Sequence, residues 1–152
     1  MKSRDASDTV LPTPDEMIHG HGLRMTDQRR AVYESLMSRR DHPSAVEVFT
    51  RVREHMSSIS LATVYNCLET LSGCGLVKTV NLERGPARYC PNLDEHAHFH
   101  CEQCGTVLDL PLRARRKPHD AWVMPEKLAI THHEVAFRGL CPACAEASSE
   151  SV

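Results

Sequence analysis

Two C-x-x-C pairs, Cys101 with Cys104 and Cys141 with Cys144, dominate the chemistry that this sequence could perform. A C-x-x-C turn brings two thiolates to one ion, and two such turns supply the four ligands of a tetrahedral zinc cage. The alternative is that one pair is a redox dithiol, but a redox C-x-x-C usually stands alone beside a βαβ pattern. We therefore predict a structural zinc site that clips together two ends of a small β-domain.

Histidines at alternate positions precede the first pair, at His96, His98 and His100. Residues two apart in a strand face the same side, so these imidazoles form either a solvated row or a ligand array. Cys90 lies shortly before them. One thiolate and two imidazoles make a zinc-like donor set, which favours a second metal site at Cys90, His96 and His98. His100 is left without a role.

Two further residues are candidates for a fourth ligand of this second site, His42 and Asp109. The first stands just before a helix cap and the second on a later strand, so the sequence leaves both open. A site containing Cys90 would lie where the two halves of the chain meet. Metal bound there can shift the balance between two orientations of the halves by its differential affinity for them. We expect such a site in a metal-gated DNA-binding protein.

The N-terminal half has the pattern of three helices followed by a β-hairpin. Each helix begins at a residue suited to capping, and these residues are Thr26, Ser44 and Ser60. Two short strand patterns follow, at 76–82 and 87–90. This order predicts a winged helix-turn-helix, whose third helix enters the major groove of DNA. A small α+β core with no role in DNA binding would have the same order.

A winged helix would place the polar residues of its third helix against DNA. These residues are Thr63, Tyr65 and Asn66, and the amide of Asn66 could read adenine. The hairpin would bring positive charge to the phosphate backbone through Lys78, Arg84 and Arg88. The net charge of the whole chain is −2, so any basic surface must be local.

The C-terminal half is rich in strand patterns. We expect strands at 98–101, 106–110 and 127–141, and a helix at 112–124 that Pro118 interrupts. A tetrahedral cage would hold these short elements together in place of a large apolar core.

The chain has 152 residues, enough for one ordinary domain or two small ones. We divide it into a flexible tail at 1–15, a winged-helix DNA-binding domain at 16–90 and a metal-binding domain at 91–152. No apolar stretch approaches the roughly 20 residues that span a membrane. The polar N-terminus lacks the apolar core of a secretory signal. We therefore expect a cytoplasmic protein with no membrane partner.

The chain resembles the ferric uptake regulator (Fur) family in six motifs that occur in the family's order. The motifs are GLRMTDQRRAVYESL, HPSAVEVF, SLATVYNCLETLSGCGLVK, RYC, HAHFHCEQCG and CPAC. The resemblance implies an α+β fold, with an N-terminal winged helix and a small α/β dimerisation domain at 91–152. It also implies a homodimeric repressor that closes onto palindromic DNA operators, near metal-uptake or stress genes, when it binds metal.

The resemblance also assigns individual residues. The two C-x-x-C pairs match the family's structural zinc cage. Tyr65 matches a recognition-helix tyrosine that meets base methyl groups, and Arg24 matches a basic residue that reaches the minor groove. The positions of the family's regulatory metal site, between the domains, match His42, Cys90, His96, His98 and Asp109.

Cys90 departs from the iron- and peroxide-sensing members, which usually carry a carboxylate there, and is similar to zinc-sensing members. His42 and Asp109 resemble the iron and peroxide type and would suit Fe2+ or Mn2+. Because the thiolate is a soft ligand, we expect Zn2+ to be favoured over Fe2+ or Mn2+ as the second, regulatory metal. Some family members have a further metal site in the dimerisation domain, built from residues that flank His96 and His98. Here those flanks are Glu95 and Ala97, and His133 is the only other clear match, so we expect this site to be incomplete. His132 has no assigned role.

These observations favour a metal-responsive repressor that controls zinc or iron homeostasis. The alternative within the family is a peroxide-sensing repressor that depends on Fe2+ or Mn2+, in which Cys90 is also an oxidation target. A zinc hydrolase or deaminase is a distant alternative, because the sequence has no H-E-x-x-H motif and the HHE at 132–134 lacks a helical setting. We therefore expect no enzyme and no catalytic residues.

Overall fold

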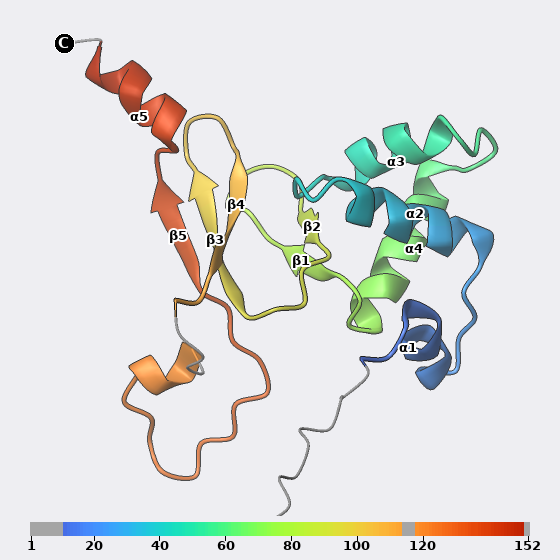
Figure 1. Ribbon diagram of the computed structural model, residues 1–152, viewed down its shortest axis with the longest axis horizontal. Coiled ribbons are helices and arrows are strands. Elements are labelled where there is room, and N and C mark those ends of the chain that lie inside the picture. The colour runs from blue at the N-terminus through green and yellow to red at the C-terminus, as the bar shows by residue number, and fades with distance from the viewer. Residues whose placement is uncertain (1–10, 114–117, 151–152) are drawn as a thin grey trace, which may run out of the picture.

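The computed structural model describes residues 11–113 and 118–150, and its N-terminal part consists of four helices and a hairpin (Figure 1). The elements are α1 (Pro14–Gly20), α2 (Asp27–Ser38), α3 (Ala45–Arg53), α4 (Leu61–Gly73), β1 (Lys78–Val80) and β2 (Arg88–Cys90). The three predicted caps are in place, because Thr26, Ser44 and Ser60 each accept a hydrogen bond from the backbone of the first helical turn. These local signals are what made the helices predictable.

The core of this part lies between α2, α3 and α4. Leu36, Val48, Leu68 and Leu71 are fully buried there. The antiparallel hairpin of β1 and β2 follows, with Thr79 opposite Tyr89, and Tyr89 packs on the same core. The arrangement confirms the predicted order of helices and hairpin in a winged helix.

Helix α1 differs from the expected tail at 1–15. It begins at Pro14, behind a capping box in which Thr13 and Glu16 bond each other's backbones, and it buries Ile18 completely. Seven residues are too short to show helical periodicity in the sequence. Residues 1–10 of the predicted tail lie outside the described residues.

The C-terminal part is a three-stranded sheet in the order β4-β3-β5. The central strand β3 (His96–Cys101) pairs antiparallel with β4 (Val107–Pro111) and parallel with β5 (Ala136–Gly139). The helix α5 (Pro142–Ser149) follows and was not predicted, since it buries no side chain and has no apolar stripe. This sheet domain with its four cysteines confirms the expected α+β fold class.

Two secondary-structure predictions in this part are wrong. The strand expected at 127–141 is regular only over β5, and residues 127–135 carry no strand. Lys127 has a positive φ of 63°, which a strand cannot accommodate. Of the helix expected at 112–124, the described residues contain only a 3-10 turn, Pro118–Ala121, and residues 114–117 lie outside the described part of the chain.

Among the described residues, no helix is both long and apolar enough to cross a membrane.

Candidate metal centres and DNA-binding surface

The four cysteines of the C-x-x-C pairs converge at one end of the sheet. Their sulfur atoms all lie within 4.8 Å of one another, and we call them the cysteine cluster. Cys101 ends β3, and Cys104 follows in a turn that Gly105 closes with a φ of 74°. Cys141 caps α5 and Cys144 lies in its first turn. The sheet and α5 therefore bring together residues that are about forty positions apart.

Backbone amides around this cluster favour thiolate at one end of it. Amide hydrogen bonds, first from Cys104 and then from Cys141, lower the pKa of the Cys101 thiol to about 6. Contacts with Cys141 and its neighbours raise the pKa of Cys144 to about 12. Four thiols this close cannot all ionise unless a cation compensates their charge. The donor set therefore suits a structural zinc ion.

A second group of donors lies where the helices meet the sheet. His42 precedes α3, Cys90 ends β2, His98 is on β3 and Asp109 is on β4, and one ligand atom of each lies within 4.8 Å of the others. His96 borders them, with its Nε2 3.0 Å from Nε2 of His98 and 3.5 Å from Sγ of Cys90. We call these five residues the mixed cluster. Both residues that the sequence left open, His42 and Asp109, are in it.

The strand register explains why these donors face one another. His98 pairs with Asp109 across β3 and β4, so both side chains emerge from the same face of the sheet. The opposite face carries Phe99, which pairs with Leu108 on one side and Phe137 on the other. One face of the sheet is therefore built from ligands and the other from apolar side chains.

Hydrogen bonds orient the rings and the carboxylate of the mixed cluster. Asp109 accepts a bond of 2.7 Å from Nε2 of His42 and one of 2.9 Å from the amide of Asn92. Nδ1 of His96 donates to the carbonyl oxygen of Asp94 at 2.6 Å. That bond leaves the lone pair of His96 Nε2 directed at His98 and Cys90. Bonds of this kind fix the tautomer of metal-binding histidines.

Burial sets the protonation of the cluster. It raises the pKa of the Cys90 thiol to about 11, and it lowers the pKa of His98 to about 4 with a further contribution from His96. Burial also acts to raise the pKa of Asp109, but hydrogen bonds from Asn92 and His42 bring it below its ordinary value. At neutral pH the cluster therefore presents a neutral His98 and a carboxylate. The Cys90 thiol, by contrast, must lose a proton to become a good ligand.

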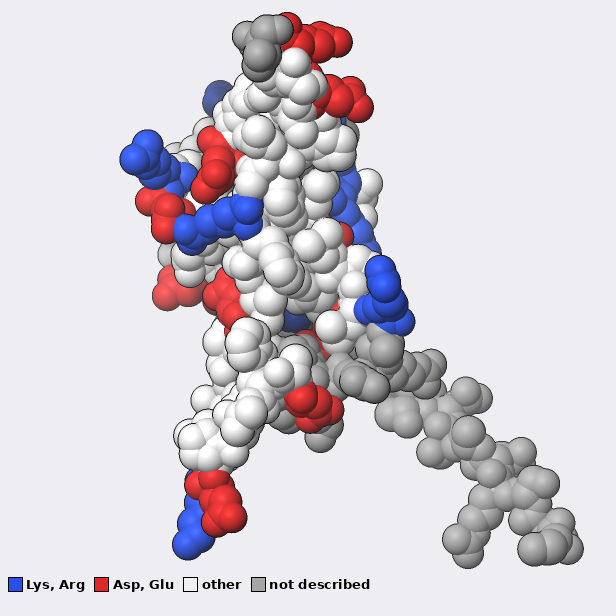
Figure 2. Space-filling model, turned by 90° about the vertical axis from the view of Figure 1, so that its left-hand side faces the viewer, with Lys and Arg blue, Asp and Glu red and all other residues white. Residues whose placement is uncertain are grey.

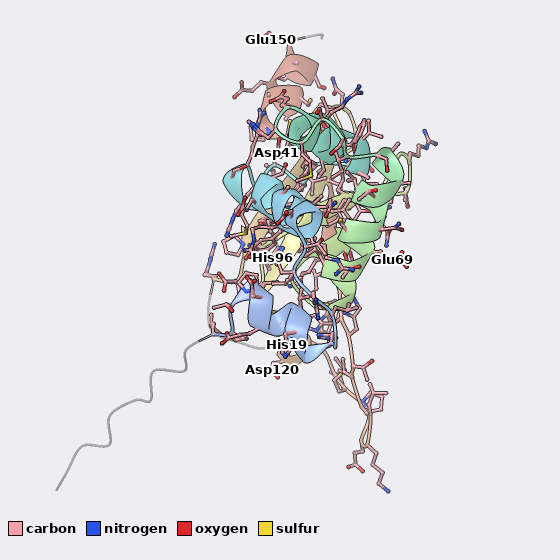
Figure 3. The ribbon with its side chains drawn as sticks, turned by 90° about the vertical axis from the view of Figure 1, so that its right-hand side faces the viewer. His19, Asp41, Glu69, His96, Asp120 and Glu150 are labelled. Atoms are coloured by element: carbon pink, nitrogen blue, oxygen red, sulfur yellow. The ribbon has the colours of Figure 1, made fainter. Side chains whose placement is uncertain are left out.

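The mixed cluster is deeply enclosed. His42 is 4% exposed, Cys90 1% and His98 6%, and Figure 3 shows His96 near the centre of the molecule in projection. Nδ1 of His42 is buried and has no hydrogen-bond partner among the described residues. Oxygen, nitrogen and sulfur donors gathered in this way fit a divalent transition metal. Because His42 and Cys90 come from the N-terminal part, an ion here would join that part to the sheet.

Within the described part of the chain, the remaining histidines form no third cluster. The cysteine cluster and the mixed cluster are the two groups of three or more donors found among the described residues. His133 lies 3.3 Å from Glu95, and His132 lines a cavity beside them. His100 is buried, and its Nε2 finds no partner within the described part of the chain. The alternating spacing correctly placed His100 on the same face of β3 as His96 and His98. Unlike those two histidines, His100 is not part of the mixed cluster.

Most of the predicted DNA-contacting residues are exposed. Tyr65 and Asn66 are exposed on α4, while Thr63 is half-buried beside the cap Ser60. Arg24, Lys78 and Arg84 are exposed as well.

Arg88 is placed differently from the other hairpin cations. Its guanidinium donates to the carbonyl of His42 at 3.3 Å and lies 3.4 Å from the carboxylate of Glu47. Its guanidinium is therefore directed at the backbone of a mixed-cluster residue and at the start of α3, and its side chain is 25% exposed. At the hairpin turn, Glu83 forms an ion pair with Arg138 of β5.

Comparison with known proteins agrees with this architecture. The family model described as "Ferric uptake regulator family" matches residues 20–138 of the chain. The peroxide-responsive repressor PerR of Staphylococcus aureus (strain Mu50 / ATCC 700699) is 31% identical over 123 residues, covering 81% of this chain and 83% of that protein. This relative shows that the similarity extends over both parts of the molecule.

Solved structures with the same fold include the peroxide stress regulator of Campylobacter jejuni, with a TM-score of 0.66 and 29% identity over 84% of this chain and 96% of that one. The Helicobacter pylori ferric uptake regulator Fur superposes with a TM-score of 0.70 at 21% identity, covering 89% and 95% of the two chains, and supports the fold alone. With a family match over most of its length and a relative above 30% identity, the chain belongs to the ferric uptake regulator family.

Proposed function

We propose that the protein is a metal-dependent, peroxide-responsive transcriptional repressor. Membership of a family of transcriptional regulators confirms the expectation that it is not an enzyme. The sequence favoured zinc or iron homeostasis and kept peroxide sensing as the alternative. The similarity to PerR repressors and to a peroxide stress regulator supports that alternative better. The observation that carries the proposal is the mixed cluster, which gathers oxidisable ligands from both parts of the chain at one point.

The two clusters have different roles in this proposal. The cysteine cluster holds a structural zinc ion and links β3 to α5. The mixed cluster holds a second, regulatory divalent metal. A redox-active ion such as Fe2+ would supply the electron that breaks the O–O bond of a peroxide. The protein contributes an enclosed site, a fixed tautomer at His96, and the thiol of Cys90 and two histidine rings as oxidation targets.

Oxidation of a ligand would act through the link between the two parts. His42 and Cys90 belong to the N-terminal part, whereas His96, His98 and Asp109 belong to the sheet. A ligand that gains oxygen no longer fits the same ion, so the metal stops favouring the DNA-binding orientation. Repression is then released.

Zinc sensing is the second candidate, because Cys90 supplies a soft thiolate in place of a carboxylate. Zn2+ has no redox chemistry. A zinc sensor would therefore respond to the concentration of the ion and ignore peroxide.

A homodimer formed through the sheet is part of the proposal. Leu108, Leu110 and Phe137 on the face opposite the ligands are 40%, 36% and 54% exposed. Figure 2, which views the molecule from the side of β5 and α5, shows few charged side chains over the middle of that side. Apolar side chains left exposed in this way mark an interaction surface. A two-fold dimer would present two α4 helices to a palindromic operator, inside the cytoplasm.

Operator binding in the presence of peroxide tests the proposal. Zinc is first bound at the cysteine cluster, and the protein is then loaded anaerobically with Fe2+, Mn2+ or Zn2+ on an operator obtained by in vitro selection. We expect micromolar peroxide to release the Fe2+ complex and to leave the Mn2+ and Zn2+ complexes intact. The Cys74→Ala variant, which removes a buried thiol outside both clusters, serves as the control. Binding that requires Zn2+ and ignores peroxide in every arm would establish the zinc sensor instead.

A further inference from the structure

His42 has a backbone conformation that non-glycine residues rarely adopt. Its φ is 54°, and Lys127 is the other non-glycine residue with a positive φ in the described chain. This left-handed conformation costs free energy, and it persists only where the surroundings hold it. Since the His42 side chain is 5% exposed and bonded to Asp109, the strained residue is itself a member of the mixed cluster.

Strand β2 holds His42 in this conformation. The guanidinium of Arg88 donates to the carbonyl of His42 at 3.3 Å. The next residue, Tyr89, donates its backbone N–H to the carbonyl of Pro43 at 3.0 Å, and Ser44 forms a β-bridge with Arg88. Each residue of the segment 42–44 therefore contacts β2.

Arg88 is also linked to the start of α3. Its guanidinium lies 3.4 Å from Oε2 of Glu47, and the same oxygen accepts a bond of 2.7 Å from the backbone of Ser44. Arg88 thus touches the capping box of a helix in the N-terminal part as well as the carbonyl of a cluster ligand. Its side chain is only 25% exposed, so it is poorly placed to meet a phosphate of DNA.

We propose that Arg88 is a positioning residue of the mixed cluster: its guanidinium holds His42 in the left-handed conformation from which the imidazole reaches the metal. The inference rests on the proposed function, because it requires the mixed cluster to bind an ion. Arg88 stands two residues before Cys90, so one short strand delivers a ligand and the side chain that aims another ligand. It also connects occupancy of the cluster to α3 through Glu47.

The rigidity of the side chain favours arginine over lysine at this position. One nitrogen of the guanidinium, Nη1, contacts the carbonyl of His42 and the carboxylate of Glu47 together, and the rigid plane of the group fixes the direction of its N–H donors. A lysine would keep the positive charge but has a single ammonium group on a flexible stem. The proposal therefore expects Arg88→Lys to restore only part of the function that Arg88→Gln removes.

Cobalt binding tests this role without reference to DNA. Co2+ is titrated into protein whose cysteine cluster already holds zinc, and its ligand-field absorption reports the ligands of the mixed cluster. We expect Arg88→Gln to weaken Co2+ binding about tenfold, the scale of a supporting interaction with a metal ligand. Its spectrum should shift to that of His42→Ala. The exposed hairpin residue Arg84 provides the matched control, and Arg84→Gln should match the wild type.

A double-mutant cycle separates positioning from general destabilisation. If Arg88 acts through His42, Arg88→Gln should weaken binding no further in the His42→Ala background. Equal Co2+ affinity of Arg88→Gln and wild type, or an undiminished effect in the His42→Ala background, would overturn the role of Arg88. If the wild-type protein, with zinc in its cysteine cluster, bound no Co2+ at the mixed cluster, both the role of Arg88 and the proposed function would be overturned. Circular dichroism and the zinc content of each variant show that the fold is intact.

Discussion

The proton on Cys90 allows the regulatory site to be tested quantitatively. Burial raises the pKa of this thiol to about 11 in the metal-free protein. A thiol must ionise before it binds a metal, so metal binding at pH 7 must release that proton. The four pH units between 7 and 11 correspond to about 5 kcal/mol, which the bond from metal to sulfur has to exceed.

Cys90→Asp removes this requirement. An aspartate ionises at a pKa of about 3.9 in water, and a rise as large as that of Cys90, from 9.0 to about 11, would still leave it ionised at pH 7. His98, whose pKa is lowered to about 4, is neutral there and releases no proton either. We therefore expect the metal affinity of the wild type to rise about tenfold per pH unit between pH 7 and 8.5, and that of Cys90→Asp to stay nearly constant.

Titration calorimetry counts the proton directly. Co2+ is added to protein with zinc in the cysteine cluster, in buffers that differ in ionisation enthalpy, and the dependence of the heat on the buffer gives the number of protons released. We expect one more proton from the wild type than from Cys90→Asp. The Cys74→Ala control should behave as the wild type. Equal proton release from the wild type and Cys90→Asp would show that Cys90 does not bind the metal as a thiolate.

Four further predictions concern other parts of the molecule. Cys101→Ser should lose zinc and unfold or become monomeric, and a folded dimer in analytical ultracentrifugation would contradict the role of the cysteine cluster. Because the folded state lowers the pKa of His98 to about 4, the unfolded chain takes up a proton first as the pH falls. The contribution of His98 to the free energy of unfolding of the metal-free protein should therefore be constant above about pH 6.5 and fall by about 3 kcal/mol between pH 6.5 and pH 4. Urea titrations of His98→Gln should lack that fall. Phe137→Asp should break the dimer and weaken operator binding, and an unchanged sedimentation coefficient would remove this face from the interface. Neutralising Lys78 and Arg84 should lower the slope of operator affinity against salt by about one for each DNA phosphate that these side chains neutralise, and an unchanged slope would place them away from DNA.

Local signals explain the part of the fold that the sequence predicted well. Thr26, Ser44 and Ser60 each cap a helix by bonding to a neighbour three residues on, so the information needed is contained in a few adjacent residues. The C-x-x-C turns are local as well. Helix α5 was not predicted because it buries no side chain. The strand expected at 127–141 was too long, because alternation of residue types does not show which residues pair with a neighbouring strand.

The mixed cluster depended on long-range structure. Whether His42 or Asp109 joined Cys90 could not be read from spacing, because the answer depends on the register of β3 and β4 and on how the turn at 42–44 lies against β2. The same packing brings the guanidinium of Arg88 to the carbonyl of His42. The sequence therefore predicted that Arg88 lies on the hairpin. Which residue its side chain contacts depends on the tertiary structure.

Operator affinity with and without the second metal is the most direct test of the central claim. The protein carries zinc in its cysteine cluster in both measurements, and fluorescence anisotropy gives the dissociation constant for one palindromic operator under anaerobic conditions. If the ion in the mixed cluster fixes the DNA-binding orientation, Fe2+ should tighten binding by about 5- to 150-fold, the usual range of coupling between two sites. The gain should vanish in His42→Ala. Equal affinity of the wild type with and without Fe2+, Mn2+ or Zn2+ would contradict the claim.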